Sequence, residues 1–169
     1  QPQPTLSQFD EQPLHIHADS REKSTGVVRK LSELGAHITL EMLDIADYVL
    51  SSRVAVELKT VPDFVDSIID GRLLDQLPTL KRSYERPLII IQGSENLYTQ
   101  RNIHPNAIRG MISTIAISYG IPIITTTSDE DTAHFLLTIA RREQEQTKKE
   151  FSPHADRKPQ SIASQQEYI

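Results

Sequence analysis

The sequence predicts an α/β domain in which a mixed central sheet is flanked by helices on both sides. Strand-type and helix-type hydrophobic patterns alternate along the middle of the chain, as they do in this fold class. The segment Pro87–Gln92, PLIIIQ, is apolar without interruption, which indicates a strand buried on both faces. The first strand patterns lie close together in the sequence, so we expect them to form an antiparallel meander and the sheet to be mixed.

The predicted folded part covers residues 14–146 of the 169. Residues 1–13 are rich in Gln and Pro and have no apolar period, so we expect an N-terminal linker. Residues 147–169 are mostly polar and are predicted to be a C-terminal linker. Linkers at both ends suggest a domain that comes from a longer protein.

The first half of the domain is predicted to contain four strands and one helix. Leu14–Ala18 alternates between apolar and polar residues, and Thr25–Leu34 has helical spacing that stops at Gly35. A turn at Ser51–Ser52 should join the last two strands into a hairpin. The later strands of this half are expected at Ala36–Met42, Tyr48–Leu50 and Val54–Lys59.

The second half alternates helices with buried strands. Two predicted helices, Asp63–Ile69 and Leu73–Ser83, are separated at Gly71. Pro105–Tyr119 should be a helix, with proline in its first turn and Gly120 directly after it. The last strand and the last helix are expected at Ile121–Thr125 and Asp129–Gln144.

The composition narrows the possible functions. Cysteine is absent, so neither disulfides nor a thiolate metal site can form, which fits a reducing cytosol. No run approaches the roughly 18 apolar residues of a membrane span, so we expect no membrane partner. The net charge of −5 argues against binding nucleic acid by bulk electrostatics alone. If the substrate is a nucleic acid, a local basic surface or another domain must add affinity.

Two acidic residues and a lysine are predicted to converge on neighbouring strands. Alternation along Val54–Lys59 puts Glu57 and Lys59 on one face and turns Leu58 toward the other. Asp47 begins the strand alongside. Carboxylates that bind Mg²⁺ or Mn²⁺, with an ammonium group to position water, suit hydrolysis of a phosphodiester. A solvated edge hairpin with an ordinary Glu–Lys pair would give the same pattern.

Several motifs follow one another in a specific order. ADSRE comes first, then Ala46-Asp47, then Glu57-Leu58-Lys59 with Asp63 four residues after the lysine, and DFVDSIIDGRLLDQ overlaps that aspartate. Residues 15–76 thereby resemble the nuclease domain of the XPF/Hef family of structure-specific endonucleases. The family signature is Gly-Asp, a variable gap, Glu-Arg-Lys, three residues and Asp. The later HPNAIRGMISTIAISYGIPI resembles the segment through which these domains dimerise.

The resemblance implies a restriction-endonuclease-like fold of the PD-(D/E)xK type. It also implies an endonuclease that requires Mg²⁺ (or Mn²⁺) and cuts forks or 3′ flaps near the branch point, in DNA repair or fork processing. Asp47 and Glu57 would hold the metal, and Lys59 would serve the attacking water. The other implied residues are Asp19, Glu22 and Asp63 in catalysis, and Arg21, Arg72 and Gln76 in DNA binding.

The resemblance also implies partners for the chain. A homodimer is expected, with Ile108, Ile112 and Ile115 at the interface. Residues 160–169 look like the lead-in to a tandem helix-hairpin-helix domain, and we expect that domain and a helicase in the full-length chain. An archaeal-type protein would be cytoplasmic, and a eukaryotic one nuclear.

Two residues depart from the family signature. Ala46 replaces glycine, which we expect to need only a small backbone adjustment. Leu58 replaces the central arginine of Glu-Arg-Lys, which leaves two functions open: a nuclease, with reduced activity, or a non-catalytic scaffold that binds DNA or a partner. A nucleotide-binding domain is disfavoured because no Gly-rich phosphate loop follows the first strand.

Simpler roles are open to some of these residues. Asp63 lies three residues after Thr60 at a helix start, so helix capping would account for it. Arg21 and Glu22 could pair with each other on a loop, and Arg72 could be an ordinary surface arginine near a helix start.

Overall fold

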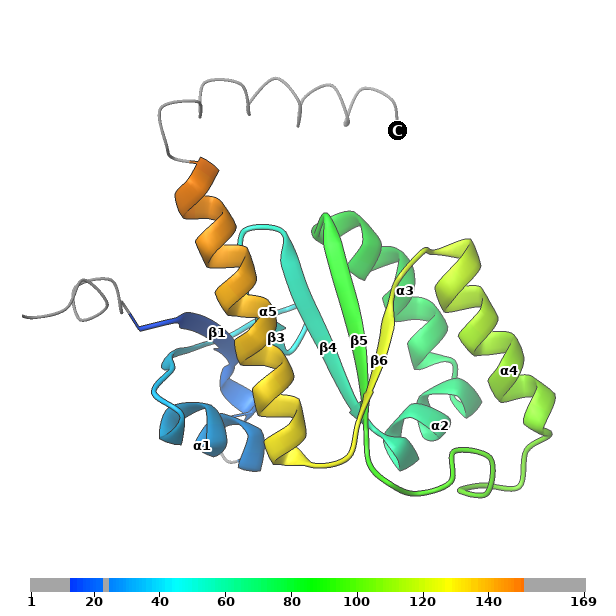
Figure 1. Cartoon of the computed structure of the whole chain (residues 1–169). Coiled ribbons are helices and arrows are strands. Elements are labelled where there is room, and N and C mark those ends of the chain that lie inside the picture. Colours follow the sequence, from blue (N-terminus) through cyan, green and yellow to red (C-terminus); the bar gives the residue numbers. More distant parts are fainter. Residues whose placement is uncertain (1–12, 23–24, 151–169) are drawn as a thin grey trace, which may run out of the picture.

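The computed structural model describes residues 13–22 and 25–150 of the chain. A six-stranded sheet forms the middle layer, and helices cover both of its faces (Figure 1). The predicted α/β class and the mixed sheet are confirmed. Within the described residues, no helix combines the length and apolarity needed to cross a membrane.

The strands lie in the order β2-β1-β3-β4-β5-β6 across the sheet. Only β3 runs antiparallel to its neighbours, which are β1 and β4, and the other neighbouring pairs are parallel. All strands except β3 therefore point the same way. The bounds are His15–Asp19 (β1), His37–Glu41 (β2), Tyr48–Val49 (β3), Val54–Thr60 (β4), Arg86–Gln92 (β5) and Ile123–Thr126 (β6).

The expected antiparallel meander is wrong for β1 and β2, which pair in parallel. A helix, α1, connects them and carries the chain back to the end where β1 began, so the second strand runs with the first. The hairpin of β3 and β4 forms as predicted, with Tyr48 opposite Val56. Ser51 stabilises its turn by accepting hydrogen bonds from the N–H groups of Arg53 at 3.3 Å and Val54 at 3.0 Å.

Side-chain caps set where two helices begin. Thr25 caps α1 by accepting from the N–H of Val28 at 3.4 Å, and Thr60 caps α2 by accepting from that of Asp63 at 3.2 Å. The Thr60 cap starts α2 two residues earlier than predicted. The helical segments are Ser20–Glu22 (a 3-10 turn), Gly26–Glu33 (α1), Val61–Ile69 (α2), Arg72–Ser83 (α3), Pro105–Ser113 (α4), Thr114–Ser118 (a π-helical turn) and Asp129–Glu150 (α5).

The sheet separates two hydrophobic cores, and β5 contributes to both, as its apolar run predicted. Ile90 packs on the side of α1 and α5, whereas Ile89 and Ile91 pack on the side of α2, α3 and α4. Val56 and Leu58 of β4 join the first core, and Ala55 joins the second. The alternation predicted for β4 is therefore confirmed, and Leu58 is turned away from Glu57.

The predicted dimer residues need a correction. Ile108 and Ile115 are fully buried in the chain's own core, because α4 and the π-helical turn pack this face against the rest of the domain. They are therefore not available to a partner. Ile112 is half-buried. Ile117, in the same turn, has 84% of its surface exposed.

Candidate active site

Polar side chains from three segments meet at one edge of the sheet. β1 ends at Asp19, the 3-10 turn after it contains Glu22, and β4 ends just after Lys59. Because β3 runs in the opposite direction, Asp47 directly before it lies at the same edge. The N–H of Asp19 donates to the carbonyl of Asp47 at 2.9 Å. Open α/β sheets usually place their functional groups at this edge.

Glu57, Lys59 and Asp47 form the centre of this cluster. Lys59 Nζ lies 3.6 Å from Glu57 Oε1, and the two side chains are only 8% and 15% exposed, respectively. Asp47 Oδ2 accepts a hydrogen bond from the backbone N–H of Leu58 at 2.7 Å. Asp47 is thus held beside β4 by a backbone group, which remains in place whatever non-proline side chain stands at position 58.

The environment disfavours charge on both central carboxylates. Burial raises the pKa of Glu57 to about 7; the charge of Asp47 adds to the effect and Lys59 opposes it. Burial likewise raises the pKa of Asp47, against the Leu58 N–H and Lys59, which favour its charged form. Two buried carboxylates with one ammonium are short of positive charge, so the pair favours a further cation.

The other acidic residues differ in their partners. Arg21 binds the buried Asp19 through two side-chain N–H groups and lowers its pKa; it also donates to the carbonyl of Leu43 at 2.9 Å. The possible Arg21–Glu22 pair does not form. Burial, together with the charges of Asp47 and Asp19, raises the pKa of Glu22 to about 7.

The oxygen atoms of Asp47 and Glu57 suit a magnesium-type ion. Asp47 and Glu57 offer only oxygen, which Mg²⁺ and Mn²⁺ prefer, and each is more basic than an ordinary carboxylate because of its burial. No group of three or more His, Cys, Asp or Glu side chains in the described ranges is arranged to hold a metal. Mg²⁺ usually keeps several waters and takes one or two carboxylates, so these two residues suffice for it.

Three predicted residues lie at or beyond the border of this cluster. Asp63 is exposed in the first turn of α2, where its N–H bonds Thr60. The Nε of Arg72 pairs with Asp70 at 2.6 Å at the start of α3. Gln76, one turn further along α3, does reach the site: its Oε1 is buried and has no hydrogen-bond partner among the described residues.

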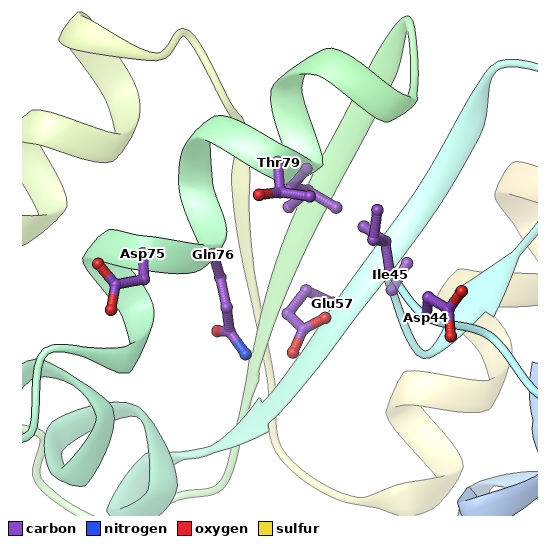
Figure 2. A pocket seen from close by; sticks show the side chains of 8 residues that line it. Asp44, Ile45, Glu57, Asp75, Gln76 and Thr79 are labelled. Atoms are coloured by element: carbon purple, nitrogen blue, oxygen red, sulfur yellow. The ribbon is translucent and has the colours of Figure 1, made fainter.

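A pocket of about 260 Å³ opens beside Glu57, between α3 and the segment that leads into β3 (Figure 2). The side chains of Gln76 and Glu57 face the same space in this view. Sequence reasoning missed most of its walls, because no motif shows that α3 and this segment meet in space. The lining residues are Asp44, Ile45, Ala46, Glu57, Asp75, Gln76, Thr79 and Leu80.

Two further residues shape the site. Ala46 adopts a φ of +74°, in the left-handed region that favours glycine, so replacing the family glycine strains the backbone directly before Asp47. Our expectation of a small adjustment understated this. Tyr48 is fully buried, and its Oη has no hydrogen-bond partner among the described residues. Burial, together with the charge of Glu22, raises the pKa of Tyr48. The sequence analysis did not single out Tyr48, and its position directly after Asp47 is the only feature of the sequence that points to a place in the site.

Comparison with known proteins agrees with this geometry. The ERCC4 domain family matches residues 18–139. A protein of Methanocaldococcus jannaschii, named as a candidate ATP-dependent RNA helicase, is 43% identical over 157 residues, which are 93% of this chain and 19% of that protein. The 3′-flap repair endonuclease Xpf of Saccharolobus solfataricus is 34% identical over 158 residues, 92% of this chain and 68% of that protein.

The solved structures give the same result. The XPF of Aeropyrum pernix in complex with DNA matches with a TM-score of 0.71 and 29% identity, over 79% of this chain and 66% of that one. The match confirms the restriction-endonuclease-like fold. The chain thus spans only about a fifth of the first relative's length and about two thirds of the others'. From the matched residues and the fold together, the chain belongs to the ERCC4 domain family of XPF- and Hef-type proteins.

Proposed function

We propose that this chain is the nuclease domain of a structure-specific DNA endonuclease that requires a divalent metal ion. It cuts forked or 3′-flap DNA near the branch point, in DNA repair or fork processing. The observation that carries the proposal is the cluster of Asp47, Glu57 and Lys59, with two buried carboxylates and one ammonium at the functional edge of the sheet. The substrate class is taken from the relatives, one of which is named for 3′ flaps.

Asp47 and Glu57 hold Mg²⁺ or Mn²⁺ in this proposal. The ion, when bound, supplies positive charge against the phosphate and lowers the pKa of nearby water. Lys59 donates hydrogen bonds to the attacking water or to a phosphate oxygen from its place beside Glu57. The N–H of Leu58 keeps Asp47 in position throughout.

The neighbouring residues orient the substrate. Arg21 steadies Asp19 and still has 68% of its side chain exposed, so it can contact a phosphate as well. Arg72 is similarly exposed beside α3 and reaches DNA by leaving Asp70. Glu22 adds negative charge beside the proposed metal site. Asp63 assists catalysis from the first turn of α2.

The full-length protein would bring further parts to this activity. A homodimer forms through the exposed side of α4 and the π-helical turn, where Ile117 is exposed. A helix-hairpin-helix domain grips the duplex. The helicase name of the first relative supports a helicase in the same chain. The part of the chain expected to lead into the helix-hairpin-helix domain lies outside the described residues.

One observation favours a second candidate function. Leu58 replaces the arginine of the family signature and packs in the core. A domain that had lost catalysis could keep the same fold as a scaffold that binds DNA or a partner. The two functions differ in whether DNA is cut.

A cleavage assay separates them. End-labelled fork, 3′-flap and linear duplex DNA are each incubated with the chain in Mg²⁺, in Mn²⁺ and in EDTA. The proposal expects cuts close to the junction of the fork and flap with either metal, and none in EDTA. Binding of branched DNA without cutting in either metal would support the scaffold.

A further inference from the structure

We propose that the pocket between α3 and the segment before β3 takes one unpaired nucleobase of the DNA strand that is cut. This inference rests on the proposed nuclease function and deepens it, because it names what the site recognises at a branch point. The pocket shares Glu57 with the metal site. Whatever enters it therefore lies beside the proposed metal site.

The size of the pocket suits a single base. Its volume of about 260 Å³ falls just below the roughly 300 Å³ at which pockets for drug-sized molecules begin. A planar heterocycle can enter such a space, whereas a base pair cannot. Ile45, Ala46 and Leu80 provide apolar walls for the faces of the ring.

The polar groups of the pocket select a base over a phosphate. Glu57 brings a carboxylate, which repels phosphate and accepts hydrogen bonds, whereas the carboxylates of Asp44 and Asp75 at the rim point away from the centre of the pocket (Figure 2). Gln76 Oε1 is a buried acceptor without a donor among the described residues, and such a group is costly unless a ligand completes it. Adenine, cytosine and guanine carry amino donors that fit these acceptors, and thymine offers fewer.

A metal ion is a poorer occupant of this pocket. Its acidic residues do not converge, since no group of three ligand-type side chains in the described part of the chain is arranged around one point. They come instead from three different elements, with apolar residues between them.

The proposal gives a physical basis for structure specificity. A paired base must be taken out of the duplex before it can enter the pocket, which costs a few kcal/mol, and a base that is already single-stranded avoids most of this cost. Forks and flaps offer such bases at the junction. Uninterrupted duplex does not.

Single abasic sites test the pocket directly. A series of forks carries one abasic nucleotide at successive positions around the cut, and kcat/KM is measured for each. We expect one position on the cut strand to lower kcat/KM by about 5- to 100-fold, which corresponds to the loss of one bound base. The neighbouring positions should have much smaller effects. Equal rates for all positions would overturn the proposal.

Filling the pocket provides the matched comparison. Thr79→Trp should slow cleavage of the intact fork but leave the sensitive abasic fork cut as in the parent, because that substrate has no base to exclude. Leu74→Trp, on the exposed side of the same helix, should behave as the parent on both. If Thr79→Trp unfolds the chain, Gln76→Leu replaces it and should reduce the preference for amino-bearing bases. For each protein, kcat/KM on the intact fork is divided by kcat/KM on the sensitive abasic fork. A folded pocket variant whose ratio equals that of the parent would contradict the proposal.

Binding distinguishes failure of the pocket from failure of the proposed nuclease function. Forks carrying 2-aminopurine at each junction position are titrated with the chain in EDTA, where no cleavage occurs. A fluorescence change at one position, abolished by Thr79→Trp, would support the pocket even if the parent cuts no DNA. No change at any position, in a chain that binds the fork, would overturn the pocket while leaving the nuclease proposal intact.

Discussion

Burial disfavours charge on both Asp47 and Glu57, and the charge of Asp47 adds to the cost at Glu57. Glu57 has a pKa of about 7 in the folded chain, against an ordinary value of 4.5. Between these values the folded state binds more protons than the unfolded state, so the free energy of unfolding contributed by this group falls as pH rises through this window. Above pH 7 the loss is complete.

Glu57→Gln should therefore stabilise the metal-free protein at pH 8, by on the order of 1–3 kcal/mol, and have little effect at pH 4. Thermal or urea unfolding in EDTA at both pH values measures this difference. Glu145→Gln, on the exposed side of α5, is the control and should change neither value. A Glu57→Gln protein that is destabilised at pH 8 would show that this carboxylate stabilises the fold.

Ala46 and Ala55 are both buried but differ in their backbone conformation. Ala55→Gly in β4 should lower the free energy of unfolding by about 1–2 kcal/mol, from chain entropy and a lost methyl group. At Ala46 the same losses are offset by relief of about 1–2 kcal/mol of left-handed strain, so Ala46→Gly should leave stability level. Urea unfolding of the two variants compares them. Equal losses would mean that Ala46 is unstrained.

The substitution Leu58→Arg restores the arginine of the family signature and tests what that arginine contributes to cleavage. An arginine there would run its stem along the face of Val56 and bring its charge to Glu22, which has no ion-pair partner among the described residues. One charge-assisted hydrogen bond is worth about 1.5–3 kcal/mol, so Leu58→Arg should cut forks roughly 10- to 150-fold faster. Its thermal stability should not exceed that of the parent. Equal cleavage rates on the same fork would show that the arginine is dispensable here.

Connections between elements explain which parts of the fold could be predicted. Alternation identified β4 and the faces of Glu57 and Leu58, because the period of a strand depends only on local geometry. The direction of β2 depends on the crossover through α1, and its proximity in sequence to β1 suggested the wrong pairing. Spacing along α4 found its apolar stripe but could not distinguish a core face from a dimer face. The pocket could not be predicted for a related reason, because the segment before β3, β4 and α3 form it and no local pattern shows that they meet.

In the π-helical turn after α4, the residue expected at a dimer interface is the exposed Ile117 and not the buried Ile115. Ile117→Glu should convert a homodimer to a monomer without lowering thermal stability, because this side chain is 84% exposed in the single chain. Ile115→Glu should instead destabilise the fold by more than about 4 kcal/mol, since it buries a charge in the core. Light scattering and thermal unfolding of both variants separate the two effects. A parent chain that is monomeric at micromolar concentration would refute the dimer.

At the scale of the whole molecule, charge limits how tightly the isolated chain binds DNA. Its net charge is −5, so affinity must come from a few exposed arginines near the site. We expect weak binding that falls steeply with salt. A fluorescence anisotropy titration at physiological salt measures it, and a Kd below about 10⁻⁸ M, the range of complete specific binding proteins, would contradict this expectation.

In the proposed nuclease, Asp47 and Glu57 together form the metal site. Fork cleavage in Mn²⁺ is measured for the parent, Asp47→Asn and Glu57→Gln, and the fold of each protein is checked by circular dichroism. Both substitutions keep the shape of the side chain and remove its charge. We expect cleavage by the parent and a loss of at least about 100-fold in each variant, equivalent to roughly 2.7 kcal/mol of transition-state stabilisation. Cleavage by both folded variants at the parent rate would contradict this metal site.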